Sequence, residues 1–185
     1  MSKKNYDLIV IGAGPGGYVA SIVAAQKGMK VANIDKRETL GGTCLNVGCI
    51  PSKALLHASE QFENNVKNNG NSDWGIEFDN IRLDLNKLMN KKLGIVDDLT
   101  KGINFLFNKN KIDRFIGEAK ITKENNVIIF KGGKEEVIQG KNIIIATGSK
   151  PSNLNNIQID EKKIVSSTGV LELDKVPKKL VVIGA

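Results

Sequence analysis

The chain has 185 residues, of which 41% are hydrophobic and 25% are charged, a balance typical of a soluble globular protein. This length suffices for one domain, or for one domain and the start of a second. No apolar run approaches the ~20 residues of a membrane helix, and residues 8–13 lack the layout of a signal peptide. We therefore expect no membrane partner and a cytoplasmic location, with an already processed protein as the alternative.

The net charge of +7 comes from 27 basic and 20 acidic residues. Only Arg37, Arg82 and Arg114 among the basic residues are arginines, the type that reads bases and phosphates with two parallel bonds. We therefore expect no nucleic-acid partner. Two cysteines exclude a disulfide-stapled scaffold. With a single histidine, a two-Cys, one-His zinc site would be incomplete, so no metal site is expected.

The first elements predicted along the chain form one βαβ unit. Residues 7–12 are an apolar run that predicts a buried strand. Residues 15–27 follow a helical pattern that ends before Gly28, and residues 31–35 predict a second strand. The three elements fit within roughly 30 residues, the size of a βαβ unit.

The middle of the chain predicts irregular structure and then two helices. Residues 41–48 are glycine-rich and are expected to be irregular, and Pro51 suits a first helical position. Residues 54–62 carry a helical face, and residues 64–73 are polar and turn-prone. Residues 85–106 follow a helical period in which Gly94 and Gly102 are candidate bends or breaks.

The last third of the chain predicts short strands at residues 112–116, 127–130, 136–138 and 142–146. Gly132 and Gly133 lie between the second and third of these strands and indicate a hairpin. Residues 153–160 are expected to be a polar linker. Residues 180–185 repeat the opening pattern of residues 8–13, which indicates a further strand leading into a second glycine turn.

Residues 12–17, Gly-Ala-Gly-Pro-Gly-Gly, match the G-x-G-x-x-G pattern between a strand and a helix. In that pattern Gly12 permits the tight turn, Gly14 lets the backbone approach a pyrophosphate, and Gly17 lets helix and strand pack closely. The helix N-terminus offers free N–H groups to the pyrophosphate, and Asp35 can accept hydrogen bonds from a ribose hydroxyl. We therefore expect a Rossmann-like dinucleotide site. The motif leaves FAD and NAD open, and a structural glycine turn is the alternative.

Cys44 and Cys49 are five residues apart, which in a regular helix separates Cα atoms by roughly 8–9 Å. A disulfide needs less than about 7 Å, so a bridge would require a distorted backbone, which Gly48 makes easier. Pro51 predicts a helix starting near Cys49, whose terminus would stabilise a thiolate. Lys53 lies one turn further on and would favour an anionic neighbour. The spacing alone leaves a redox pair and two inert buried cysteines equally open.

Residues 41–53 are very similar to the redox-disulfide signature of the flavin disulfide reductases, the class I pyridine nucleotide-disulfide oxidoreductases. Residues 40–56 most resemble the dihydrolipoamide dehydrogenase branch of that family. Glutathione reductases usually have a second lysine where Ser52 stands, and mercuric reductases usually have valine at positions like Leu45 and Ile50. The similarity extends to residues 146–151 and 166–184.

The resemblance implies an FAD-dependent oxidation of dihydrolipoyl groups by NAD, through dithiol, flavin and nicotinamide in turn. Cys44 would be the interchange thiol that attacks the substrate disulfide, Cys49 would lie beside the flavin, and Lys53 would lie near its ring. The remaining cofactor contacts that it implies are at Gly12, Gly14, Gly17, Asp35, Lys36, Gly42, Thr43, Gly117, Ala119, Thr147, Gly148 and Ser149. Two residues depart from the family pattern, which usually has Glu at Asp35 and often Gly at Ala119.

The family pattern also implies the domain organisation. Residues 1–150 would be an FAD-binding α/β domain with a central parallel sheet and a small antiparallel β-meander, residues 151–177 a linker, and residues 178–185 the first strand of a truncated NAD-binding domain. The NAD domain and the interface domain, whose His–Glu base comes from the partner subunit in the family, are expected to be missing from this chain, and His57 is expected to be structural or on the surface. This chain alone is therefore expected to be inactive with NAD, to hold FAD weakly and to self-associate.

The partner implied for the full-length enzyme is the lipoyl domain of a 2-oxo acid dehydrogenase or glycine cleavage complex, and a homodimer is expected. Three alternatives remain at this point. One is another flavin disulfide reductase, such as a mercuric or glutathione reductase, and a second is a flavin-free, non-catalytic fragment. The third is a plain NAD-dependent dehydrogenase built on one Rossmann unit, in which the paired cysteines would have no role.

Overall fold

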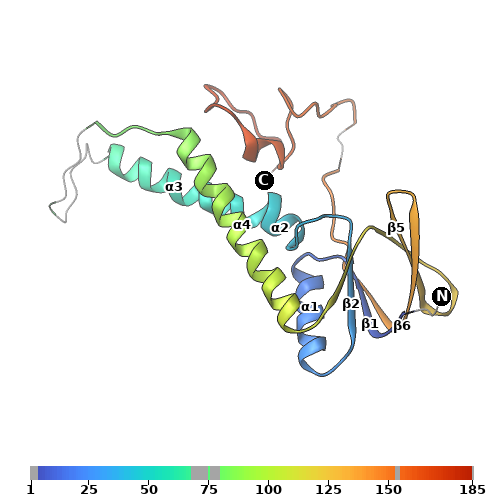
Figure 1. Ribbon diagram of the computed structural model, residues 1–185. Coiled ribbons are helices and arrows are strands. Elements are labelled where there is room, and N and C mark those ends of the chain that lie inside the picture. Colours follow the sequence, from blue (N-terminus) through green and yellow to red (C-terminus); the bar gives the residue numbers. More distant parts are fainter. Residues whose placement is uncertain (1–3, 68–74, 76–79, 153–154, 185) are drawn as a thin grey trace.

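The computed structural model describes residues 4–67, 75, 80–152 and 155–184 (Figure 1). Its strands are β1 (Lys4–Ile11), β2 (Val31–Asp35), β3 (Asp113–Ile116), β4 (Glu118–Ile121), β5 (Asn126–Lys131) and β6 (Lys134–Ile145). Its helices are α1 (Pro15–Gln26), α2 (Gly42–Val47), α3 (Cys49–Lys67) and α4 (Leu85–Lys109), with short 3₁₀ turns η1 (Lys123–Asn125) and η2 (Gly169–Glu172). The predicted βαβ unit is thus confirmed as β1–α1–β2.

The strands form one six-stranded sheet in the order β3-β2-β1-β6-β5-β4. The pairs β3–β2, β2–β1 and β1–β6 are parallel, whereas β6–β5 and β5–β4 are antiparallel. The expected parallel sheet and β-meander are therefore both present, and the 12-residue strand β6 belongs to each. The prediction of two separate strands at 136–138 and 142–146 was wrong, because β6 runs unbroken between its two neighbours. Strand β4 was not predicted.

The sheet buries two cores on its opposite faces, and the side chains of β1 alternate between these cores from Leu8 to Ile11. Leu8 and Val10 on β1 face the side covered by α1 and α4, where they pack with Ile103 and Phe107 of α4. The opposite face is covered by the meander, where the buried residues are Tyr6, Ile9, Ile11, Ala32, Ile34, Val127, Ile129 and Ile138. Figure 1 shows the same division: α1 and α4 lie on one side of β1 and β2, and the β5–β6 hairpin lies on the other side of these two strands.

Helix α4 is a single 25-residue helix, so neither Gly94 nor Gly102 breaks it. Asp84 caps its N-terminus by accepting a hydrogen bond from the Lys87 N–H at 3.0 Å. A Cβ added at either glycine would meet no atom within 4 Å. The two glycines therefore lie on an open face, and packing of the opposite face against the sheet and α3 keeps the helix continuous.

Helix α3 continues to Lys67, so the predicted turn at residues 64–73 is wrong for its first four residues, and residues 68–73 lie outside the described part of the chain. The helix is amphipathic and packs against α4 (Figure 1). In the part of the chain that the structure describes, no helix is long and apolar enough to cross a membrane.

The segment after β6 has little regular structure. Lys92 of α4, only 5% exposed, donates a hydrogen bond from Nζ to the Leu171 carbonyl at 2.5 Å and so attaches η2 to α4. Residues 180–184 do not form the predicted strand, and Val181 and Ile183 are 86% and 70% exposed. A strand needs a neighbour to complete its hydrogen bonds, and no described strand lies beside this segment. The division at residues 151–177 and 178–185 stays a prediction.

Candidate dinucleotide site and redox disulfide

The glycine loop between β1 and α1 is built so tightly that two of its glycines have no room for a side chain. Gly12 has φ +107°, and a Cβ there would lie 2.1 Å from the Ala146 carbonyl oxygen. A Cβ on Gly17 would lie 1.9 Å from the Gly12 carbonyl oxygen. Only glycine satisfies both contacts, so the predicted roles of Gly12 in the turn and of Gly17 in close packing fit the geometry.

The polar groups at the start of this loop are all turned toward the protein. The Gly12 N–H donates to the Ile34 carbonyl at 2.7 Å, and the Ala13 carbonyl accepts from the Gly41 N–H at 2.9 Å. The first intrahelical bond of α1 runs from the Tyr18 N–H to the Gly14 carbonyl at 2.9 Å. The N–H groups of the first turn of α1 therefore have no intrahelical acceptor and are available to an anion.

Asp35, at the end of β2, holds the loop with its carboxylate. Its Oδ2 accepts from the Ala13 N–H at 2.6 Å, and its Oδ1 accepts from the Arg37 N–H at 2.8 Å. A carboxylate has about four acceptor positions, so these bonds leave capacity for a ribose hydroxyl. The contact to Ala13 was not anticipated from the sequence, which assigned Asp35 to the ribose alone. Lys36, beside it, is exposed.

The start of β4 lies against the end of β2. The Gly117 N–H donates to the Asp35 carbonyl at 2.9 Å, and a Cβ on Gly117 would lie 2.6 Å from the Phe130 carbonyl oxygen. Ala119 pairs with Ile129 of β5 and packs against the meander core. The sheet therefore brings the predicted adenine-side residue Gly117 into contact with the predicted ribose residue Asp35.

Arg114 of β3 is a further residue of this edge that sequence reasoning missed. Its Nη2 donates hydrogen bonds to the carbonyls of Arg37 and Glu38, which follow Asp35. Burial lowers the pKa of the Arg114 guanidinium, and its Nε is buried without a partner in the described part of the chain. Arg114 thus ties the chain after β2 to β3. An arginine in a predicted strand of mostly apolar residues was the available signal.

Residues 41–48, predicted to be irregular, instead contain the short helix α2. It starts at a left-handed Gly41 (φ +98°) followed by Gly42 (φ +59°). A Cβ on Gly42 would lie 2.5 Å from the Gly14 Cα. Helix α2 therefore begins in direct contact with the glycine loop, a contact that requires glycine at position 42.

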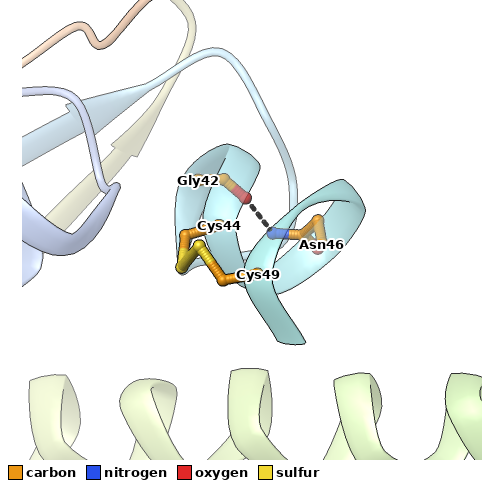
Figure 2. The surroundings of a disulfide bond; sticks show 4 residues. All are labelled: Gly42, Cys44, Asn46 and Cys49. Atoms are coloured by element: carbon orange, nitrogen blue, oxygen red, sulfur yellow. Dashed lines mark hydrogen bonds between the residues drawn. A yellow bond between two sulfur atoms is a disulfide. The ribbon is translucent and has the colours of Figure 1, made fainter. Parts of the chain in front are cut away.

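Asn46 fixes the start of α2. Its Nδ2 donates to the carbonyl of Gly42 at 2.8 Å (Figure 2) and to that of Leu40 at 3.0 Å. Its Oδ1 accepts from the Thr39 hydroxyl at 2.7 Å. These bonds stabilise a six-residue helix that would be too short to persist in isolation. Asn46 was not predicted as a site residue, although a polar side chain midway between the two cysteines was a visible signal.

Cys44 of α2 and Cys49, the first residue of α3, form a disulfide with a Cα–Cα distance of 4.7 Å (Figure 2). The predicted backbone distortion is at Gly48, whose φ of −144° and ψ of −116° separate the two helices. A Cβ on Gly48 would lie 2.9 Å from the Thr43 carbonyl oxygen. The helix break thus brings together two cysteines that one continuous helix would hold apart.

The two sulfur-bearing residues differ in their surroundings. Cys44 is half-buried and packs against the helix-side core, whereas Cys49 is exposed at the N-terminus of the 19-residue helix α3. Lys53 follows one turn further along α3 and is exposed. Once the disulfide is reduced, the helix N-terminus would favour the thiolate of Cys49 over that of Cys44.

The predicted site residues not yet described are Thr43, Thr147, Gly148 and Ser149, and His57 was expected to be structural or on the surface. Thr147 follows β6 next to Gly12, and a Cβ on Gly12 would lie 3.2 Å from the Thr147 Cα. Gly148 has φ +70°, and Thr43, Gly148 and Ser149 are exposed. His57 is exposed on α3. The structure therefore gathers the glycine loop, Asp35, Gly42 and Thr147 at the carboxyl end of the parallel strands, where ligands bind in such sheets.

The fold and the site together define an α/β protein in which a Rossmann-type glycine loop contacts a helix that carries a disulfide. The family model described as pyridine nucleotide-disulphide oxidoreductase matches residues 6–185. The chain belongs to this family of disulfide oxidoreductases.

Relatives with known names support the same placement. The mitochondrial dihydrolipoyl dehydrogenase of Sus scrofa is 54% identical over 180 residues, which cover 97% of this chain and 35% of that protein. The corresponding enzyme of Dictyostelium discoideum is 51% identical over 99% of this chain and 37% of its own length. Leghemoglobin reductase of Glycine max is 51% identical over 97% of this chain and 34% of its length. The chain thus spans about a third of the relatives that it matches.

Among solved structures, the chain resembles the copper(II) complex of the HOCl-induced flavoprotein disulfide reductase RclA of Escherichia coli. The TM-score is 0.75 at 25% identity, over 96% of this chain and 36% of that one. The Rossmann-like fold expected from the sequence is therefore that of a flavoprotein disulfide reductase.

Proposed function

We propose that this chain is the FAD-binding, disulfide-bearing portion of a dihydrolipoyl dehydrogenase. In this role it would oxidise dihydrolipoyl groups to the lipoyl disulfide and transfer the electrons through FAD to NAD. The observation that carries the proposal is the contact between Gly14 and Gly42, because it joins a dinucleotide loop to the helix that begins the redox-disulfide segment.

The residues present suit FAD. The missing side chains at Gly14 and Gly42 leave the backbone accessible beside the first turn of α1, whose N–H groups can hold a pyrophosphate. Asp35 retains acceptor capacity for a ribose hydroxyl and Gly117 lies beside it, and Ala119 would be a further adenine-side contact. When bound, FAD would supply a two-electron acceptor for the dithiol. Lys36, Thr43, Lys53, Thr147, Gly148 and Ser149 are further contacts under this proposal.

The disulfide exchange can be written from the two cysteines alone. A substrate thiolate attacks the Cys44 sulfur, the Cys44–Cys49 bond breaks, and the electron pair stays on Cys49. The second substrate thiolate then attacks the substrate sulfur of the mixed disulfide, which releases Cys44 as a thiolate and forms the lipoyl disulfide. Each substrate thiol gives up its proton, so two electrons and two protons leave the substrate.

The direction of attack follows from the position of the two cysteines. The sulfur whose negative charge is better stabilised leaves faster in disulfide exchange, and the N-terminus of α3 would stabilise a thiolate at Cys49. This favours Cys49 as the leaving sulfur and Cys44 as the sulfur that is attacked. The assignment agrees with the roles that the family resemblance implies.

The substrate and the partners are the most specific part of the proposal. Relatives called dihydrolipoyl dehydrogenase and leghemoglobin reductase are about equally similar to this chain, so identity in this portion does not separate the two activities. We favour dihydrolipoyl groups, carried by a lipoyl domain of a 2-oxo acid dehydrogenase or glycine cleavage complex, with NAD as co-substrate and a homodimer as the full-length assembly. The cytoplasmic location also stays a prediction, since the matching relatives include mitochondrial enzymes.

The test is to mix the oxidised chain, without FAD so that the electrons stay on the two cysteines, with dihydrolipoamide and count the protein thiols after the reagent is removed. Two thiols per chain should appear, with oxidation of one equivalent of dihydrolipoamide. Cys44→Ser and Cys49→Ser variants should yield no such exchange. Retention of the disulfide in the presence of excess dihydrolipoamide would contradict the proposal.

A competition with reduced glutathione separates the main alternative. Dihydrolipoamide closes its own ring and releases the protein dithiol, whereas glutathione needs a second molecule for this step. Dithiothreitol is the reference for this chelate effect, because it is also a dithiol that closes its own ring. A faster reaction with dihydrolipoamide than with dithiothreitol supports a lipoyl substrate. Equal rates for the two dithiols would favour another flavin disulfide reductase.

A further inference from the structure

The peptide group between Gly12 and Ala13 is held at both ends by side chains of β2. Its carbonyl, on Gly12, accepts from the Asn33 Nδ2 at 3.1 Å, and its N–H, on Ala13, donates to the Asp35 Oδ2 at 2.6 Å. Residues 33 and 35 point to the same side of the strand because side chains alternate. One strand therefore sets the orientation of the first peptide of the dinucleotide loop.

Asn33 also reaches the other end of the glycine motif. Its Nδ2 donates to the Ser21 hydroxyl at 3.0 Å, and that hydroxyl donates to the Gly17 carbonyl at 2.9 Å. Asn33 and Ser21 are both 0% exposed. The amide thus links the first and the last glycine of the motif through two hydrogen bonds and one hydroxyl.

This arrangement is unusual for a core position. The neighbours of Asn33 on β2 are Val31, Ala32 and Ile34, which are buried and apolar. The Asn33 Oδ1 has no hydrogen-bond partner in the described part of the chain, and an unpaired buried polar atom is destabilising. An apolar residue would avoid this cost, so the amide is explained by its two donors and not by packing.

We infer that Asn33, supported by Ser21, is a positioning residue for the dinucleotide loop: its amide keeps the Gly12 carbonyl turned into the protein and the loop in its binding conformation. The inference rests on the proposed FAD site for its effect on binding. Its effect on the loop itself does not depend on the identity of the ligand.

Amide hydrogen exchange tests the effect on the loop in the ligand-free chain. Asn33→Ala should increase exchange at the Ala13 N–H by about tenfold, the factor expected for one lost hydrogen bond, relative to the Val10 N–H in the core of β1. Val31→Ala is the matched control, because it truncates a buried residue on the same face of β2 whose side chain donates no hydrogen bond to the loop. It should not change the ratio of exchange at Ala13 to that at Val10.

Ser21→Ala is the milder variant and decides the question if Asn33→Ala does not fold. It removes the bond to Gly17 and one bond of Asn33 but keeps the bond to Gly12, so a smaller selective increase, about threefold, is expected at Ala13. Equal changes at Ala13 and Val10 in these variants, or no change, would overturn the inference.

Flavin binding provides the second measurement. With FAD added to the apoprotein, Asn33→Ala should raise the Kd by about tenfold by fluorescence titration, and Val31→Ala should leave it within about twofold. An unchanged Kd in Asn33→Ala would overturn the link to binding. If the unsubstituted chain takes up no FAD, the proposed function fails, whereas the exchange measurement still decides the role of Asn33.

Discussion

Gly42 lies so close to Gly14 that a Cβ added to Gly42 would come within 2.5 Å of the Gly14 Cα. This contact connects the loop after β1 with the first residue of α2, and two residues later α2 carries Cys44. The dinucleotide loop and the disulfide are therefore parts of one packed unit, and a change at the contact should affect both.

Gly42→Ala tests this contact. Besides the clash with Gly14, the substitution puts a Cβ on a residue with φ +59°, where left-handed backbone costs about 1–2 kcal/mol for a non-glycine residue. We expect a loss of about 2 kcal/mol or more in the free energy of unfolding, and at least a tenfold weaker FAD affinity. Urea denaturation and flavin titration measure the two effects. A variant with unchanged stability and flavin affinity would show that the two segments do not pack as described.

Gly102→Ala is the matched control and a prediction in its own right. Gly102 is inside α4, and a Cβ there would meet nothing within 4 Å. Alanine should raise the free energy of unfolding by about 0.5–1 kcal/mol, because glycine is the poorer helix residue. Urea denaturation should show this gain, with flavin affinity unchanged. A loss of stability would indicate that the helix bends at this residue after all.

Asn46→Ala should make the Cys44–Cys49 disulfide easier to reduce. The variant loses two hydrogen bonds to the carbonyls of Leu40 and Gly42, so the two thiols would be held together less rigidly. At about 1 kcal/mol for each net bond, equilibrium with a glutathione redox buffer should shift about tenfold or more toward the dithiol. Counting thiols across a range of buffer ratios gives this shift.

Thr39→Val is the control for the Asn46 variant. It removes only the hydroxyl that donates to Asn46 and leaves both amide bonds in place, at an exposed position. Its disulfide equilibrium should change by less than threefold, which is about 0.65 kcal/mol. If both variants shift the equilibrium equally, the amide bonds of Asn46 are not what stabilises the disulfide.

Tyr6→Phe should remove part of the loss of stability at alkaline pH. Burial and the hydrogen bond from its hydroxyl to Asp113 Oδ2 at 2.8 Å raise the pKa of Tyr6 well above its usual 10.0. The neutral phenol is therefore favoured in the folded chain, so this stabilisation is complete below pH 10 and is lost as the pH rises above it, where the unfolded tyrosine ionises first.

At neutral pH the Tyr6→Phe variant should be less stable by about 1–2 kcal/mol, the cost of one hydrogen bond to a carboxylate. The difference from the unsubstituted chain should shrink as the pH rises past about 10. Urea denaturation at pH 7, 9 and 10.5 measures it, and the lysines that titrate in this range are common to both chains. A difference that grows with pH would mean that folding lowers the pKa of Tyr6 instead of raising it.

The most regular sequence patterns predicted their elements well. The apolar run before Gly12 corresponds to β1, which is buried on both faces of the sheet, and the helical period of residues 85–106 corresponds to α4, which buries one face. Such burial requires apolar residues at regular positions, and these positions are visible in the sequence. Helix α2 and strand β4 were missed, since their short sequences carry no such repeat. Helix α2 is stabilised by Asn46 and by contact with the glycine loop, and β4 by pairing with β5.

Residues 180–183 show the converse. Their apolar pattern is that of a strand, and they form none in the described structure. The pattern records a preference, but a strand exists only where a neighbouring strand completes its hydrogen bonds.

The residues that carry the chemistry could be identified from the sequence alone. They are the loop at residues 12–17, Asp35, and the pair Cys44 and Cys49, and glycines and cysteines at such spacings have few other roles. Their mutual arrangement came only with folding. The sequence shows Asn33 as one polar residue in an apolar strand, and nothing in it indicates that this amide meets Gly12 and Ser21. Contacts between segments distant in the chain depend on how strands and helices pack, and a local pattern carries no record of them.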